Sequence, residues 1–186
     1  MIKKIYREDS LLLSSFNELT RNTFRFDFVK WHRAGHFGDM YVPHVMLDGE
    51  KVVSNVSVNR MQFDIDGTVK NFIQLGTVMT DKNYRGQGLN KKIMESIIQE
   101  YADKVDGIYL FGNDSVLDYY PKFGFVPSEE YEYYFSFENG SNAIPYAMEK
   151  VDMSDEVQAK CKCQYKNVGF LENKSVGFPT SLFSIF

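Results

Sequence analysis

The sequence contains few residues of the kinds that build disulfide frameworks or metal sites. Among its 186 residues there are only 2 cysteines and 3 histidines. Cys161 and Cys163 are separated by a single residue, a spacing that would strain a disulfide between them. A zinc site would need further cysteine or histidine ligands, and the histidines lie far away in the sequence. We therefore expect no metal and regard both thiols as structural or incidental.

Long apolar runs and a basic charge balance are also absent. No apolar run reaches the roughly 18 residues of a membrane-spanning helix, and the N-terminal residues lack a long apolar stretch. The net charge of −4 argues against a nucleic-acid surface and mildly favours cationic, amine-bearing partners. We expect a cytoplasmic protein that binds neither membranes nor nucleic acids.

Aromatic residues are abundant. The chain has 16 phenylalanines and 12 tyrosines, a composition that favours a β-rich core and a ligand groove. Its length suits one domain, with or without an appendage.

The hydrophobic pattern predicts two helices followed by a series of strands. The first helix begins near Asp9 and Ser10, and the second covers 26–34, before a glycine. Two dipeptides of the hairpin-turn type, at 48–49 and 66–67, separate the strands that follow. These strands are expected at 45–47, 51–58, 61–64 and 69–80.

Further elements are expected after residue 87. They are a helix at 88–104, a strand at 107–112, a short helix at 114–121, and strands at 125–126 and 131–137. Residues 139–186 form a C-terminal extension after a polar linker. Its apolar end, 181–186, closes a sheet edge, pairs with a second subunit, or belongs to a longer natural chain; the sequence leaves these alternatives open.

The loop Arg85–Asn90 is the most informative segment, because it joins a strand to an amphipathic helix. The first N–H groups of a helix have no intrahelical partner, and glycines allow a backbone to bring such groups close to an anion. The loop therefore predicts a binding site for a phosphorylated ligand. It lacks the Gly-Lys-Ser/Thr end of a mononucleotide P-loop, and Lys91 stands where a dinucleotide loop needs its third glycine.

This loop resembles the acetyl-CoA loop of the GNAT N-acetyltransferase superfamily, [Gln/Arg]-x-x-Gly-x-[Gly/Ala]. Arg85 and Gly88 match the pattern, and Asn90 departs from its last position. A second motif follows at the expected distance, because Asn113 and Tyr120 stand seven positions apart and Gly124-Phe125 completes a Tyr-x-x-x-Gly-Phe segment. The resemblance covers roughly residues 40–138.

The resemblance implies an α/β (α+β) fold. Its sheet is mixed, mostly antiparallel and twisted, is flanked by helices, and has a parallel, splayed strand pair at the CoA site. A bulge near Gly76 and Thr77 would help to open that pair. The GNAT domain is expected to span 1–138, with 139–186 as the extension of uncertain structure.

The resemblance also assigns roles to individual residues. Tyr120 is the expected general acid for the departing sulfur, because a phenol with a pKa of about 10 keeps its proton at neutral pH. Gln74 is a candidate substrate contact, and the long strand at 69–80 supplies no carboxylate as general base. The expected acetyl-CoA ligands are Val78, Met79, Thr80, Arg85, Gly86, Gln87, Gly88, Leu89, Asn90, Lys91 and Asn113.

The expected function is therefore transfer of an acetyl group from acetyl-CoA to a primary amine in a ternary complex. The acceptor would be a small molecule or a peptide, and a homodimer is one assembly that the sequence leaves open. Two alternatives remain: a non-catalytic acyl-CoA-binding sensor or interaction module, and an enzyme that uses a longer acyl-CoA.

Overall fold

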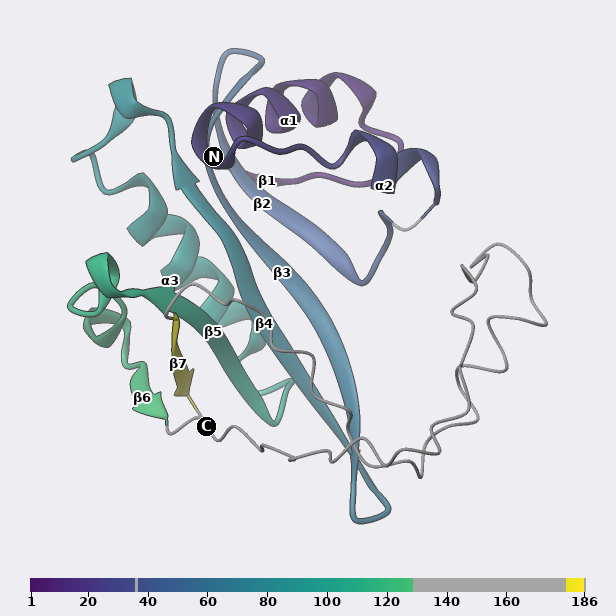
Figure 1. Ribbon diagram of the computed structural model, residues 1–186, viewed down its shortest axis with the longest axis vertical. Helices are drawn as coiled ribbons and strands as arrows, with labels where there is room; N and C mark the ends of the chain where they lie inside the picture. The colour runs from purple at the N-terminus through teal and green to yellow at the C-terminus, as the bar shows by residue number, and fades with distance from the viewer. Residues whose placement is uncertain (36, 129–179, 186) are drawn as a thin grey trace, which may run out of the picture. The chain divides into compact units, whose positions relative to one another are not determined.

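A seven-stranded mixed sheet forms the centre of the part of the chain that the computed structural model describes, residues 1–35, 37–128 and 180–185 (Figure 1). Its order is β1-β2-β3-β4-β5-β7-β6, and only the β4–β5 pair is parallel. The strands are β1 (Ile2–Lys4), β2 (Tyr41–Asp48), β3 (Lys51–Ile65), β4 (Thr68–Thr80), β5 (Gly107–Asn113), β6 (Val126–Ser128) and β7 (Thr180–Ile185). The predicted mixed, mostly antiparallel sheet with one parallel pair is confirmed.

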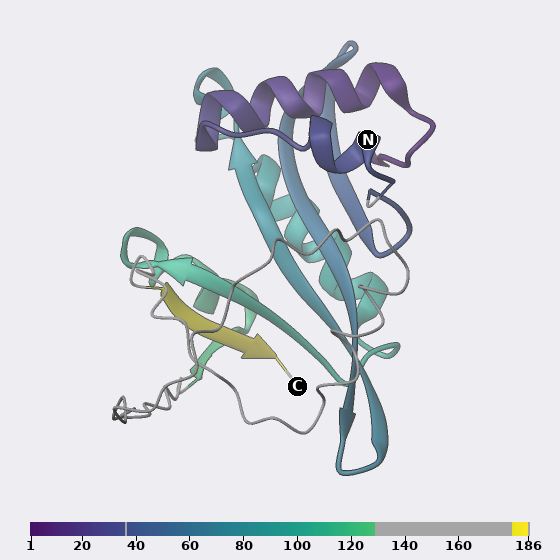
Figure 2. The ribbon, with the colours of Figure 1, turned by 45° about the vertical axis from the view of Figure 1, so that its right-hand side comes forward.

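Helices cover both faces of this sheet. In Figure 2, α1 (Ser10–Phe24) crosses in front of the upper ends of the strands, and α3 (Leu89–Tyr101) lies behind them. Leu13 and Phe16 of α1 pack in one buried cluster with β2, while Ile93 and Ile97 of α3 pack in another with β3, β4 and β5. The short α2 (Val29–Arg33) follows α1. No helix in the described residues is long and apolar enough to cross a membrane.

Because helices cover both faces of the sheet, the first half of β3 is buried on both of its faces. Residues 52–58 are buried without interruption, as expected for a strand packed on both faces. The second half of β3 extends with β4 beyond this core, and most of its side chains are exposed. The sequence predicted separate strands at 51–58 and 61–64, whereas β3 is a single strand.

A β-bulge interrupts the pairing of β3 with β4. Ser57 lies opposite Gly76 and Asn55 lies opposite Met79, so one residue of β3 faces two residues of β4, Thr77 and Val78. Thr77 has a left-handed backbone with φ of 49°. The bulge predicted near Gly76 and Thr77 is confirmed.

The parallel pair β4–β5 is short. Its pairing runs from Phe72–Gly107 to Leu75–Leu110. Beyond these residues the two strands diverge, as Figure 2 shows. Only Gly76 separates the bulged residues, Thr77 and Val78, from Leu75, the last residue of β4 that pairs with β5.

The helix predicted at 114–121 is wrong. The structure has two 3₁₀ turns there, η2 (Asp114–Val116) and η3 (Tyr120–Phe123). Pro121 cannot donate the backbone hydrogen bond that a continuous helix requires, and Gly124, at φ of 90°, ends the second turn. The three-residue strand β1 was not predicted.

The C-terminal strand β7 lies between β5 and β6 and is antiparallel to both. The apolar segment near the end of the sequence thus takes part in the central sheet. The predicted strand at 131–137, the domain boundary at 138 and both cysteines lie outside the described residues.

Candidate functional site

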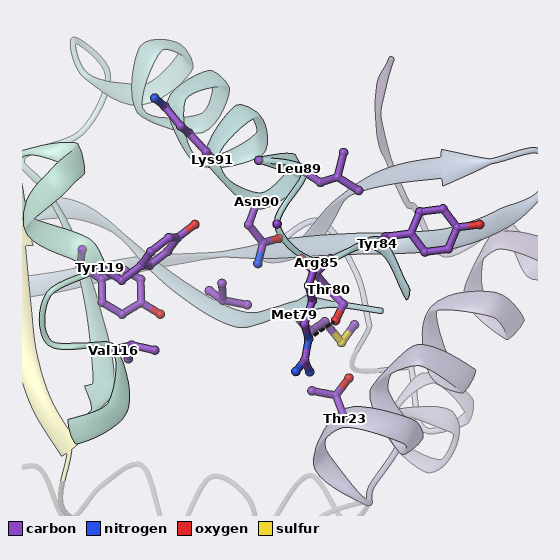
Figure 3. A pocket seen from close by; sticks show the side chains of 14 residues that line it. Thr23, Met79, Thr80, Tyr84, Arg85, Leu89, Asn90, Lys91, Val116 and Tyr119 are labelled. Atoms are coloured by element: carbon purple, nitrogen blue, oxygen red, sulfur yellow. Dashed lines mark hydrogen bonds between the residues drawn. The ribbon is translucent and has the colours of Figure 1, made fainter. Parts of the chain in front are cut away.

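A cavity of about 520 Å³ lies where β4 and β5 diverge, beside the first turn of α3 (Figure 3). This volume is within the range of small-molecule sites. It gathers segments distant in sequence: the end of β4, the loop before α3, and the turns after β5. Its lining residues are Thr23, Val78, Met79, Thr80, Tyr84, Arg85, Gly86, Gly88, Leu89, Asn90, Lys91, Val116, Tyr119 and Tyr120. The predicted site residues are thus all in its lining, apart from Gln74, Gln87 and Asn113.

The glycines of the loop border the cavity and leave open space where a side chain would stand. Gly86 and Gly88 both have a left-handed backbone, with φ of 76° and 69°. A Cβ atom added at either position would meet no other atom within 4 Å. The loop conformation therefore favours glycine, and the space above it is open to a ligand.

The start of α3 is suited to an anion. Gly88 is the residue before the helix, and it provides no side-chain hydrogen bond to the first-turn N–H groups. Arg85 and Lys91 add positive charge, and Arg85 is anchored by a hydrogen bond of 3.3 Å from Nε to the Thr80 carbonyl oxygen. The described lining contains no carboxylate. A bound anion would therefore meet no negatively charged side chain in the described lining.

Asn90, the residue that departs from the loop pattern, is held from the sheet side. Its Oδ1 accepts a hydrogen bond of 2.5 Å from the hydroxyl of Ser54, which is fully buried on β3. In Figure 3 the Asn90 side chain projects between Tyr119 and Arg85. Since Oδ1 is bound to Ser54, the amide nitrogen occupies the other branch of the side chain and is available to a ligand.

Two neighbouring tyrosines line the cavity next to β5. Tyr120 is 5% exposed, and burial raises the pKa of its phenol to about 12. Tyr119 is less buried, its pKa is also raised by burial, and its ring centroid lies 5.3 Å from that of Tyr120. Both phenols therefore stay protonated at neutral pH and can act as hydrogen-bond donors.

Three predicted site residues are placed elsewhere. Gln87 is exposed on the loop. Asn113 caps the turn η2, because its Oδ1 accepts hydrogen bonds from the Ser115 backbone N–H at 3.1 Å and hydroxyl at 2.6 Å. Gln74 pairs with Tyr109 across the parallel pair. Their assignment as ligand contacts stays a prediction.

Other residues of this region were missed by the sequence analysis. Thr23, Tyr84 and Val116 reach the cavity from outside the recognised motifs. Ser54, Asn55 and Ser57 are fully buried on β3. Polar residues between the valines of a buried strand were the available signal for this second group, because buried polar groups need specific partners.

Metal-ligating side chains do not gather in the described residues. No group of three or more histidine, cysteine, aspartate or glutamate side chains comes close enough together there to hold an ion.

A family model matches this chain. The model of an acetyltransferase (GNAT) domain matches residues 13–128, more than half of the chain. The match includes β4, the glycine loop, α3, β5 and both tyrosines.

Solved structures share the fold at low sequence identity. A predicted acetyltransferase from Clostridium acetobutylicum, solved with acetyl-CoA, is 15% identical with a TM-score of 0.57, over 73% of this chain and 95% of that chain. An aminoglycoside acetyltransferase from an uncultured soil metagenomic sample, in complex with sisomicin, is 15% identical with a TM-score of 0.59, over 74% of this chain and 96% of that chain. A probable N-acyltransferase from Enterococcus faecalis is 21% identical with a TM-score of 0.57, over 67% of this chain but only 31% of that chain.

Proposed function

Because the chain belongs to the GNAT acetyltransferase family, we propose that it transfers an acetyl group from acetyl-CoA to a primary amine. One observation carries this proposal. The open glycine loop, the first turn of α3 and the bulged end of β4 all border a single cavity. The pyrophosphate of CoA needs an anion site, and its pantetheine arm needs a free strand edge.

In this account the pyrophosphate of CoA binds over Gly86 and Gly88, against the first-turn N–H groups of α3. Arg85 and Lys91 supply charge, and the Asn90 amide donates a further hydrogen bond. The pantetheine arm extends along Val78–Thr80. This part of β4 lies beyond the last residue paired with β5, so its backbone groups on that side are open to a ligand.

The chemistry is a direct transfer. The amine nitrogen attacks the thioester carbon, negative charge forms on the carbonyl oxygen, and collapse of this intermediate breaks the C–S bond. The phenol of Tyr120 protonates the departing thiolate, and the proton lost by the amine passes to solvent. The high pKa of Tyr120 keeps this proton in place until sulfur carries negative charge.

The acceptor is proposed to be a small molecule or a peptide that bears a primary amine. The aminoglycoside acetyltransferase solved in complex with sisomicin supports a small-molecule acceptor, because it shares the fold of this chain. The acceptor approaches from the sheet face covered by α1 and α2, since CoA occupies the side of α3.

A non-catalytic CoA-binding role is the second candidate. It is favoured by the lining of the cavity, whose described residues include no carboxylate or histidine to serve as general base. In that case CoA would bind without turnover.

Calorimetry and thiol release test these proposals together. The purified protein is titrated with CoA and acetyl-CoA, and release of free thiol from acetyl-CoA is then followed with a panel of primary amines. Binding accompanied by amine-dependent thiol release supports the enzyme. Binding without release, for any amine and at any pH tested, supports the sensor, and absence of binding contradicts both.

A further inference from the structure

Four polar side chains form a continuous hydrogen-bond chain beneath the bulge of β4. Asn55 Nδ2 donates to Ser57 Oγ at 3.0 Å, and Ser57 Oγ donates to the hydroxyl of Tyr41 at 2.9 Å. The Tyr41 hydroxyl lies 2.9 Å from Thr77 Oγ1. Asn55 Nδ2 also donates to the Thr77 carbonyl oxygen at 2.8 Å, so both ends of the chain meet at the same residue.

The direction of this chain follows from the chemistry of its members. A carbonyl oxygen can only accept, so the amide nitrogen of Asn55 must face Thr77. Ser57 accepts from Asn55 and uses its single hydrogen on Tyr41, which leaves the phenolic hydrogen of Tyr41 for Thr77 Oγ1. Thr77 Oγ1 therefore keeps one lone pair and its own hydrogen for a further partner.

Burial fixes this arrangement. Asn55 and Ser57 are fully buried and Tyr41 is 5% exposed. The Tyr41 ring packs among Phe28, Trp31 and Phe37, with centroid distances of 5.2 Å to each. Burial also raises the pKa of Tyr41 to about 12, so its phenol stays protonated and keeps donating. With little water at these positions, no member can turn away without losing a buried hydrogen bond.

Thr77 itself is partly exposed and strained. A β-branched residue with φ of 49° is an outlier, and such strain is commonly found at functional sites. Glycine would adopt this conformation freely but would lack the hydroxyl. The next residue, Val78, lines the cavity, while the Thr77 hydroxyl points to Tyr41 on the face of α1 and α2. Thr77 thus stands between the cavity and the opposite face of the sheet.

We propose that Thr77 Oγ1 is the contact that receives the amine nitrogen of the acceptor, and that Asn55, Ser57 and Tyr41 are positioning residues that aim this hydroxyl. An N–H of the amine donates to the remaining lone pair of Oγ1, which leaves the nitrogen lone pair free to attack the thioester. The hydrogen-bond chain begins at the amide nitrogen of Asn55, which cannot take up a proton. The hydrogen-bond chain therefore holds the amine and does not deprotonate it. This proposal rests on the proposed acetyl transfer.

Substitution of Thr77 tests the proposal, with acceptor kinetics and CoA affinity measured on each variant. Thr77→Val keeps the branched shape and removes the hydroxyl, whereas Thr77→Ser keeps the hydroxyl. Thr77→Val should lower kcat/KM for the amine by about 10- to 100-fold, the effect of losing one buried hydrogen bond to a reacting group. The dissociation constant of CoA should change by less than about twofold, and Thr77→Ser should retain most of the wild-type kcat/KM.

Tyr41→Phe tests whether the hydrogen-bond chain acts through the Thr77 hydroxyl. Tyr41→Phe should lower kcat/KM for the amine with little change in CoA affinity. The double variant Tyr41→Phe/Thr77→Val should lose no more than Thr77→Val alone, because the phenol acts only through the threonine hydroxyl. Additive losses in the double variant would overturn the positioning role of Tyr41.

The remaining outcomes separate this inference from the function on which it rests. A wild type that acetylates amines, with Thr77→Val equally active, overturns the role of Thr77 and leaves the proposed function intact. A parallel loss of CoA affinity in Thr77→Val also overturns it, because the hydroxyl then serves only to shape the bulge. A wild type that binds CoA and acetylates no amine overturns both proposals.

Discussion

Ser54 and Asn90 are joined by a hydrogen bond that links β3 to the first turn of α3. The Ser54 hydroxyl donates to Asn90 Oδ1 at 2.5 Å, and it also lies 3.1 Å from the hydroxyl of Thr80. Since Ser54 is fully buried, it can hold the Asn90 oxygen only from the sheet side. The residue that departs from the family's loop pattern therefore presents its amide nitrogen to the cavity.

Substitutions of Asn90 should follow from this orientation. Asn90→Ala should weaken CoA binding by about 0.5–1.5 kcal/mol, the net value of one hydrogen bond. Asn90→Asp should weaken it more, because a carboxylate oxygen would replace the amide nitrogen and repel the phosphates. Calorimetry with CoA measures both effects. Equal affinities for the Ala and Asp variants would mean that this side chain does not face the ligand.

Gly88→Glu should abolish CoA binding. The side chain would project into the open space above the loop and place a negative charge beside the pyrophosphate, at a backbone conformation that disfavours any side chain. Gly49→Glu is the matched control. Gly49 has φ of 59°, its Cβ position is equally open, and it lies in the β2–β3 turn outside the cavity lining.

Gly49→Glu should bind CoA with the affinity of the wild type, although its backbone strain should be similar to that of Gly88→Glu. If both glutamate variants lose affinity equally, general destabilisation would explain the effect and the loop would not be the phosphate site.

Tyr120→Phe should lower kcat by about 10²–10⁴-fold, as expected for loss of a general acid. The ring and its contact with Phe125 remain, so KM for acetyl-CoA and the folded structure should change little. Steady-state kinetics at saturating amine measure this. The same substitution at Tyr119, which lines the same cavity, identifies which phenol serves the sulfur.

A third tyrosine provides the remote control for this experiment. Tyr101 is also 5% exposed, and its hydroxyl accepts a hydrogen bond from Arg60 outside the lining of the cavity. Tyr101→Phe should leave kcat close to the wild-type value. Unchanged kcat in Tyr120→Phe would remove Tyr120 from the mechanism.

His44 should make stability depend on pH below neutrality. Burial on β2 lowers the pKa of its imidazole to about 4, and its Nδ1 lies 3.0 Å from the Val42 carbonyl oxygen. Between pH 6.5 and pH 4 the unfolded chain takes up a proton that the folded chain does not. The contribution of neutral His44 to the free energy of unfolding is therefore complete above pH 6.5. It is lost as the pH falls toward 4, by up to about 3 kcal/mol.

Urea unfolding at several pH values measures this dependence. Wild type should lose stability more steeply between pH 6.5 and pH 4.5 than His44→Leu, in which the titrating ring is absent. Parallel slopes for the two proteins would show that His44 does not contribute.

The sequence predicted the parts of the site that local rules control. The bend of the glycine loop and the start of α3 follow from residue type and spacing, whereas the bulge near Gly76 was expected from the family resemblance, and the structure has each of them. The motif that resembles the family's pattern singled out Tyr120, which lies in the cavity lining, and its role stays a prediction.

The parts that were missed depend on contacts between distant segments. Ser54 and Asn90 are 36 positions apart, as are Tyr41 and Thr77, and nothing local in the sequence shows that they meet. The failed prediction of a helix at 114–121 has a local cause, because Pro121 lacks the backbone N–H that a continuous helix requires.

Direct observation of acetyl transfer tests the central claim. The protein is mixed with an equimolar amount of acetyl-CoA, with or without a panel of primary amines, and protein and small molecules are analysed by mass spectrometry after one turnover. We predict an amine carrying one acetyl group, free CoA in equal amount, and no acetylated protein when amine is omitted. Acetyl-CoA that remains intact beside every amine, or an acetyl group bound to the protein without amine, would contradict direct transfer.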